Sequence, residues 1–172
     1  KPGQVALMDG EFVRPDRVQA LKSLGIVPSL FPMHTFYWGD WYKQIVGPEQ
    51  AALISPMRSI LNTGLHATSH TDAPVALPNL MQVVWATVNR TSRSGTVIGP
   101  DERVTPYEAM KMITLWGAEQ FGEQATKGSI QEGKLADLVV LSDNPLTVDP
   151  ATINQIQVLE TIKEGKTVWV RE

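Results

Sequence analysis

The chain has 172 residues, of which 42% are hydrophobic and 19% charged, an ordinary balance for one globular domain or a domain with a small appendage. A formal net charge of −3 without a basic tract argues against nucleic acid, and no apolar run approaches the roughly 20 residues that span a bilayer. The absence of cysteine excludes disulfides and thiolate chemistry. We therefore expect a soluble, cytoplasmic protein with neither a nucleic-acid nor a membrane partner.

Short apolar segments alternate with helical segments over the first 90 residues. Segments 5–8, 26–31 and 65–70 have the length and apolar character of buried strands. The order strand, helix, strand, helix, strand, helix is typical of parallel β/α units. Helices are predicted where Pro15 can occupy a first turn and where apolar residues recur at helical spacing, over 15–24, 47–54, 56–62 and 79–90.

Three features between these elements carry separate predictions. Residues 34–42, HTFYWGDWY, are dense in aromatic and polar groups and are predicted to form a loop. Pro28 inside the second strand indicates an edge strand or a bulge, because proline cannot donate to a sheet. Arg90 ends the last of these helices and Arg93 follows it, and both are predicted to lie on a solvated face or loop.

The remainder of the chain is predicted to form one helix and a small sheet. Thr105 and Glu108 fit a capping box, which begins a helix that runs to Phe121. Residues 138–141 form an apolar strand, and Glu164-Gly165 suits the turn of a hairpin. The two strands of that hairpin cover 158–162 and 167–170.

The three parallel units do not make a self-contained fold. They form neither a closed barrel nor a comfortable open sheet, and their outer strands would leave unpaired edges. The N-terminal sequence KPGQVALMDG has too short an apolar stretch for a signal peptide and runs into a strand almost at once. We therefore expect this chain to be part of something larger.

The segment ATSHTDAPV, residues 67–75, holds a histidine and an aspartate two residues apart. In an extended strand His70 and Asp72 share a face at about 7 Å between Cα atoms, whereas His66 lies about 20 Å from Asp72, too far for one ion. One histidine and one aspartate are too few ligands for zinc. On spacing alone, a polar strand end that turns before Pro74 is the favoured interpretation.

The position of these residues along the fold favours a site. Asp9, His34 and Asp72 each follow one of the three predicted strands, and in α/β barrels the chemistry lies at the carboxyl ends of the strands. Three ionisable side chains are thus expected at one rim. The aromatic segment that contains Trp38 either lines a pocket there or packs locally, and the sequence favours neither.

Three stretches together resemble the metal-dependent amidohydrolase superfamily, in particular the amidohydrolase family 3 branch, which includes N-substituted formamide deformylases. LGIVPSLFPMHTFYWGDWY is similar to the strand-seven region of that branch, and SHTDAPV to its strand-eight segment. KGSIQEGKLADLVVLSDNPL, with TIKEGKTVWV after it, resembles the return from the barrel into a small β-sandwich. The resemblance covers nearly the whole chain, but only the C-terminal third of such an enzyme.

The resemblance implies an α/β fold, the C-terminal part of a (β/α)8 TIM-type barrel (strands 6–8 and their helices) plus part of a β-sandwich. Residues 1–125 would be the partial barrel and 126–172 the sandwich part. One or two divalent metals, most commonly zinc, would activate water for hydrolysis. Asp72 matches the strand-eight aspartate, which is catalytic and contacts the metal or takes the proton of the water. His34, His70 and Trp38 would contact substrate.

This sequence departs from the pattern of the superfamily in two ways. Asp9 stands where relatives carry a strand-six metal-binding histidine; aspartate can bind zinc, so Asp9 joins Asp72 as a candidate ligand. The His-x-His motif of strand one, the bridging lysine or glutamate and the strand-five histidine would all lie upstream of Lys1. This chain alone cannot assemble a complete metal site of that kind.

The principal hypothesis is the C-terminal part of a metal-dependent hydrolase that acts on carbon–nitrogen bonds of amide or formamide-like small molecules, inactive as an isolated chain. Its partner would be the missing N-terminal half of the barrel. The alternatives are a non-catalytic chain that works by association, including with copies of itself, and a small-molecule-binding module with an amidohydrolase-like fold.

Overall fold

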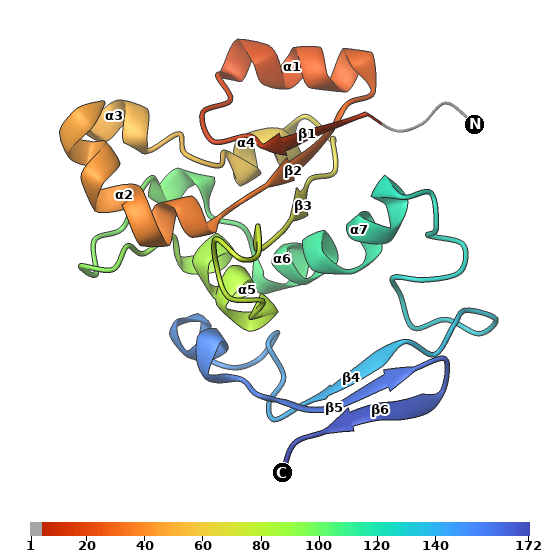
Figure 1. Cartoon of the computed structure of the whole chain (residues 1–172). Helices are drawn as coiled ribbons and strands as arrows, with labels where there is room; N and C mark the ends of the chain where they lie inside the picture. Colours follow the sequence, from red (N-terminus) through yellow and green to blue (C-terminus); the bar gives the residue numbers. More distant parts are fainter. Residues whose placement is uncertain (1–4) are drawn as a thin grey trace.

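A small parallel sheet lies at the start of the computed structural model, which describes residues 5–172 (Figure 1). Its strands are β1 (Ala6–Asp9), β2 (Val27–Leu30) and β3 (Thr68–Ser69), in the order β1-β2-β3. The register pairs Asp9 with Leu30 and Leu30 with Ser69, so the three strands end at one edge of the sheet. The predicted parallel order is confirmed, but β3 is far shorter than the predicted strand over 65–70.

The prediction that Pro28 marks an edge strand or a bulge is wrong, because β2 is the central strand of this sheet. The backbone N–H groups of Val27 and Phe31 point to β1 and donate to Val5 and Asp9. The nitrogen of Pro28 therefore faces the β3 side. Pairing with β3 begins only at Ser29, so the donor that proline lacks is not needed.

One or more helices follow each strand of the first sheet along the chain. Gly25 ends the first helix in the left-handed conformation, the Asn79 side chain caps another, and Thr105 and Glu108 form the predicted capping box. Helix 105–121 was predicted to be continuous, but it breaks at Thr114. The elements are α1 (Pro15–Leu24), α2 (Met33–Ile45), α3 (Pro48–Ala51), α4 (Met57–Asn62), α5 (Leu80–Asn89), α6 (Pro106–Ile113) and α7 (Leu115–Gln120), with short 3₁₀ turns η1 (Pro100–Glu102) and η2 (Pro150–Gln155).

The predicted loop over 34–42 is wrong, since these residues lie within α2. Its aromatic side chains pack on Phe31 and on buried residues of α5. Ile98 packs directly on Gly39, inside this helix. A side chain at position 39 would not fit, because its Cβ would be 2.8 Å from the Ile98 Cγ1 atom. Burial of aromatic surface thus outweighs the weak helix propensity of the segment.

The prediction of a solvated Arg90 is also wrong. It is 1% exposed rather than solvated, and its guanidinium lies among backbone carbonyls. Arg93 is exposed, as predicted, and lies 5.9 Å from the centre of the Tyr37 ring.

The C-terminal part forms a second, antiparallel sheet of β4 (Leu138–Leu141), β5 (Val158–Lys163) and β6 (Lys166–Val170). Glu164 and Gly165 both have positive φ, 49° and 77°, as the tight hairpin turn requires. Figure 1 shows α5, α6 and α7 between this sheet and the first one. The division into domains at residue 126 stays a prediction.

The main core lies where the first sheet, α4 and α6 meet, around Leu30, Met57, Ile60 and Met112, all fully buried. η2 joins this core through Ile153 and is bound to α5 by a hydrogen bond from the Trp85 indole to the Ala151 carbonyl, 3.0 Å. Among residues 5–172, no helix is both long and apolar enough to cross a membrane.

Candidate metal and substrate site at the strand ends

The ends of β1 and β3 bring Asp9, His70 and Asp72 together. Asp9 is the last residue of β1, and His70 and Asp72 follow β3. One ligand atom from each residue lies within 4.8 Å of the other two, and the His70 Nε2 atom is 3.6 Å from the Asp9 Oδ1 atom. The structure therefore gathers the two carboxylates that the sequence proposed as metal ligands, and adds His70 to them.

The backbone is bent into an uncommon conformation at both carboxylates. Asp9 has φ 66° and Asp72 has φ 49°, in the left-handed region that residues other than glycine rarely adopt. Gly10, at φ 47°, lies so close to Leu30 that a Cβ would be 2.3 Å from its Cδ2 atom. Such conformations persist where the surrounding structure fixes them, and they cluster at functional sites.

One buried ring orients both histidines of the rim. Phe31 is 1% exposed; the His70 ring stacks on it at 5.6 Å and 18°, and the His34 ring meets its edge at 4.8 Å. Trp38 lies 5.7 Å from the His34 ring. His34 and Trp38 thus lie beside the Asp9, His70 and Asp72 group, on the first two turns of α2.

Several polar atoms of this rim are buried without a hydrogen bond. Within the described part of the chain, Asp9 Oδ1, Glu11 Oε1, His34 Nδ1 and His70 Nε2 have no hydrogen bond and almost no exposed surface. Burying a polar atom without a partner is costly, and most buried polar atoms in proteins are paired. Four such atoms in one place indicate a site arranged for a ligand.

Glu11 is a site residue that the sequence analysis missed. Its Oε1 atom lies 3.9 Å from the His34 Nε2 atom. Burial, and then the Glu11 carboxylate, raise the pKa of Tyr42 to about 12. The available signal was a second acidic residue two positions after Asp9, just beyond the predicted strand over 5–8.

Burial is the main cause that lowers the pKa of His34 below its ordinary value. The carboxylates of Glu11, Asp9 and Asp72 oppose this by raising it, and His70 adds to the lowering. Because burial dominates, His34 is neutral at neutral pH and can both donate and accept a hydrogen bond.

His66 lies outside this group, as its spacing predicted. Its Nδ1 atom is 2.6 Å from the Glu119 Oε2 atom, and its ring stacks on Trp116 at 4.5 Å. It therefore belongs to the packing of α7 against the segment that leads into β3.

The donor set of Asp9, His70 and Asp72 fits a divalent metal. Imidazole nitrogen and carboxylate oxygen are ligands that zinc accepts, and catalytic zinc sites commonly use three protein ligands. The unpartnered Asp9 Oδ1 and His70 Nε2 atoms are the atoms that a cation would satisfy. Asp72 is the exposed member of the group, so it faces the space in front of the rim.

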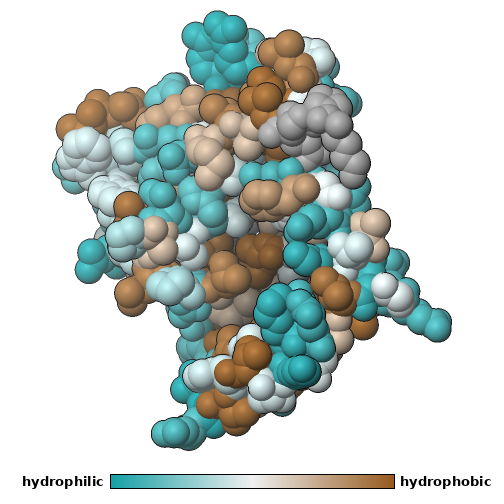
Figure 2. Space-filling model, turned by 45° about the vertical axis from the view of Figure 1, so that its right-hand side comes forward, coloured by the Kyte–Doolittle hydropathy of each residue, from teal (hydrophilic) through white to brown (hydrophobic). Residues whose placement is uncertain are grey.

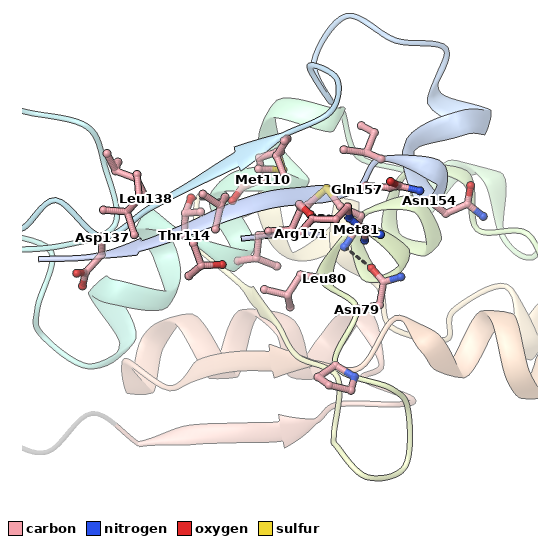
Figure 3. Close-up of a pocket in the computed structure, with 18 of the residues that line it drawn as sticks. Asn79, Leu80, Met81, Met110, Thr114, Asp137, Leu138, Asn154, Gln157 and Arg171 are labelled. Atoms are coloured by element: carbon pink, nitrogen blue, oxygen red, sulfur yellow. Dashed lines mark hydrogen bonds between the residues drawn. The ribbon is translucent and has the colours of Figure 1, made fainter. Parts of the chain in front are cut away.

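Two large apolar hollows lie elsewhere, between the helices and the second sheet. One, of about 1030 Å³, is lined by the start of α5, by α6 and by β4 and β5 (Figure 3). The other, of about 750 Å³, continues along α7 and β4. Figure 2 shows apolar side chains gathered in a hollow on this side of the molecule. No residue of the strand-end rim lines either of them.

Comparison with known proteins shows similarity over most of this chain. The amidohydrolase family model matches residues 1–169. An N-substituted formamide deformylase of Arthrobacter pascens is 32% identical over 148 residues, which are 86% of this chain and 27% of that protein. A 5-methylthioadenosine/S-adenosylhomocysteine deaminase of Thermodesulfovibrio yellowstonii is 29% identical over 52% of this chain and 20% of its own length. The chain thus spans about a quarter of the length of these curated relatives.

Solved structures share the fold. A metal-dependent hydrolase of uncharacterized function from Pyrococcus horikoshii superposes with a TM-score of 0.71 at 21% identity, over 87% of this chain and 30% of that one. An adenosine deaminase from Xanthomonas campestris with bound zinc gives a TM-score of 0.67 at 16% identity, over 93% and 36%. At these identities the likeness concerns the fold alone.

Proposed function

We propose a function from the premise that this chain belongs to the amidohydrolase family. The chain would be the C-terminal part of a metal-dependent hydrolase acting on carbon–nitrogen bonds other than peptide bonds, with amide or formamide-like substrates. The observation that carries the proposal is the group of Asp9, His70 and Asp72 at the ends of the parallel strands β1 and β3, in which Asp9 and His70 each have a buried atom without a hydrogen bond.

In this proposal β1, β2 and β3 are strands six, seven and eight of a (β/α)8 barrel. The parallel order, the common edge at which the strands end and the helices after each strand support it. The remaining strands and ligands would come from the N-terminal half, the partner that the isolated chain lacks.

Asp9, His70 and Asp72 would hold the divalent metal, most commonly zinc in proteins of this kind. When bound, the metal supplies a Lewis acid and lowers the pKa of bound water. Asp72 is the catalytic residue, because its exposed carboxylate can take a proton from water and return it to the departing nitrogen. Neutral His34, with Glu11 and Trp38 beside it, would orient the substrate.

Zinc titration of the chain by calorimetry tests the site. We expect weak binding with one ion per chain, because three ligands are present but the other walls are not. Asp72→Asn should weaken it at least tenfold. Asp40→Asn is the matched control, since Asp40 accepts hydrogen bonds from Ser92 and Ser94 and lies outside the rim. Equal weakening by both substitutions, or no binding to the unsubstituted chain, would contradict the proposal.

A turnover assay tests the expectation that the isolated chain is inactive. The chain with zinc should not hydrolyse N-substituted formamides above background. Turnover that Asp72→Asn abolishes would show that this part of the fold suffices for the reaction.

Association is the second candidate function, and exposed apolar surface favours it. In the edge strand β6, Val168 is 60%, Trp169 45% and Val170 57% exposed. Unpaired strand edges and exposed apolar surfaces are places where another chain commonly binds. Light scattering after size exclusion distinguishes the cases: a stable homo-oligomer supports association between copies, and a monodisperse monomer counts against it.

A further inference from the structure

We infer that Ser55 and Arg90 are positioning residues that hold the segments after β1 and β2 in register at the strand-end rim. The inference rests on the proposed function for that rim, and it names two residues outside the ionisable group. Ser55 lies between α3 and α4 and is 0% exposed. Its φ of 45° is uncommon for a residue with a side chain, which indicates that its surroundings fix it.

Ser55 joins the two segments through different groups. Its backbone N–H donates to the Glu11 carbonyl at 2.9 Å, and its hydroxyl donates to the Phe31 carbonyl at 3.2 Å. The Phe31 carbonyl also accepts the backbone N–H of His34 at 3.1 Å. Ser55 therefore binds the backbone at Glu11 and also the Phe31 carbonyl, which accepts the N–H of His34 in the first turn of α2.

These hydrogen bonds position residues of the strand-end rim. Glu11 and His34 carry unpartnered buried atoms, and Phe31 carries the ring on which His70 stacks. A shift of the Phe31 backbone would move both imidazoles relative to Asp9. Sites of this kind depend on geometry held to a fraction of an ångström by supporting residues.

Arg90 holds the backbone around Ser55 in place. Its guanidinium donates to the carbonyls of Ser55 (3.0 Å), Ile54 (2.6 Å) and Ala52 (3.2 Å), and its Nε to Ile98 (2.8 Å). A planar fork with five donors satisfies such a set, which a lysine cannot do. The buried charge thus holds the backbone of the segment that presents Ser55.

Close packing supports the same segment. Gly99, at φ 59°, lies against it so tightly that a Cβ would be 2.0 Å from the Ala52 carbonyl oxygen. Arg90 itself adopts the left-handed conformation at the end of α5, with φ 53°. Gly99 and Arg90 therefore contact the segment 52–55 closely from two sides.

The test uses amide hydrogen exchange by NMR on the chain with Ser55→Ala. We expect amide exchange at His34 on the order of tenfold faster. The substitution removes the buried hydrogen bond from Ser55 to the Phe31 carbonyl, and that carbonyl is the acceptor of the His34 N–H. Thr87→Val is the matched control: the Thr87 hydroxyl is also buried and donates to a backbone carbonyl, that of Val83 at 2.8 Å, within α5. Ser55→Gly, which removes the same hydroxyl and tolerates a φ of 45°, covers the case in which Ser55→Ala does not fold.

Exchange at His34 that is no faster in the Ser55 variants than in Thr87→Val would overturn the inference. A cobalt titration adds a readout that a purely structural role would not move: at equal melting temperature, Ser55→Ala should bind Co²⁺ several-fold more weakly than Thr87→Val. If the unsubstituted chain binds no Co²⁺, the proposed metal site fails, while the exchange rates still decide the role of Ser55.

Discussion

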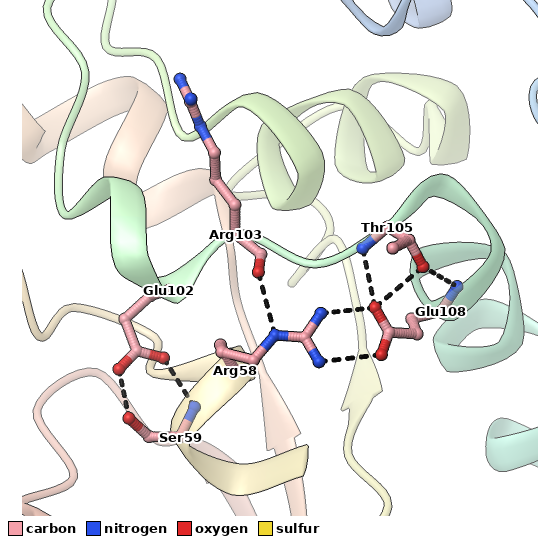
Figure 4. A network of polar contacts seen from close by, with 6 residues as sticks. All are labelled: Arg58, Ser59, Glu102, Arg103, Thr105 and Glu108. Atoms are coloured by element: carbon pink, nitrogen blue, oxygen red, sulfur yellow. Dashed lines mark hydrogen bonds and ion pairs between the residues drawn. The ribbon is translucent and has the colours of Figure 1, made fainter. Parts of the chain in front are cut away.

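Two groups of charged side chains in this molecule are built in opposite ways. Around α4, η1 and α6, the two glutamates have partners: Arg58 forms a two-bond ion pair with Glu108, and both oxygens of Glu102 accept from Ser59 (Figure 4). At the strand-end rim, Asp9, Glu11, His34 and His70 each have a buried atom that makes no hydrogen bond. The first arrangement stabilises the fold, and the second leaves bonding capacity for a ligand.

The largest effect is expected at the rim, on metal affinity. Replacing His70 with Phe removes one of three donors and should lower zinc affinity about 100-fold, near 2.7 kcal/mol. The stability of the metal-free chain should hardly change, because the His70 Nε2 atom makes no hydrogen bond and only a 3.6 Å contact with the Asp9 carboxylate. Calorimetric titration and thermal unfolding measure the two quantities. A loss of stability as large as the loss of affinity would break the contrast.

The ion pair should behave in the reverse manner. Arg58→Met leaves Glu108 without its two-bond partner and removes the bond to the Arg103 carbonyl, so we expect a loss of about 2 kcal/mol in unfolding free energy. Zinc affinity should stay within twofold. Urea denaturation gives the free energy, and a clear drop in zinc affinity would show that the two regions are not separate.

Acid should weaken the same ion pair. The side-chain hydrogen bond from Arg58 is the main cause that lowers the pKa of Glu108 from 4.5 to about 2. A lowered carboxyl pKa contributes stability that is full above 4.5 and is lost as the pH falls through about 2. We expect on the order of 1–2 kcal/mol, reduced by solvent screening.

The comparison of wild type with Glu108→Gln isolates this contribution. The difference in unfolding free energy between them should shrink between pH 4.5 and pH 2. A difference that is constant over that range would mean that Glu108 is not held in its charged form by Arg58.

The smallest effect is expected at the helix cap. Thr105 accepts the N–H of Glu108 at 3.2 Å, and Glu108 accepts the N–H of Thr105 at 2.7 Å. Thr105→Ala should cost about 1 kcal/mol of unfolding free energy. Thr126→Ala, which removes an exposed hydroxyl bonded only to the Glu123 carbonyl, serves as the control. A control variant as unstable as Thr105→Ala would remove the special role of the cap.

Local patterns predicted the features that depend on local physics. The apolar strands, the capping box and the Glu164-Gly165 turn were readable because their residues act on near neighbours in sequence. A common rim of Asp9, His34 and Asp72 was predicted from parallel strand order, which the sheet confirms. The close grouping of His70 with the two carboxylates was found only in the structure.

The features that the sequence did not reveal depend on contacts distant in the chain. Residues 34–42 are helical because their rings pack on Phe31 and α5, and Arg90 is buried because segment 52–55 offers it carbonyls. Glu11 joins the site only because the backbone turns at Asp9 and Gly10. Neither residue type nor spacing carries this information.

X-ray absorption of the zinc-loaded chain tests the central claim most directly, namely that the strand-end rim is a metal site. The chain has only three histidines, so the count of imidazole ligands is informative. We predict one imidazole with oxygen ligands around zinc, lost in His70→Phe and unchanged in His66→Asn. An imidazole signal that persists in His70→Phe, or that disappears in His66→Asn, would contradict the account.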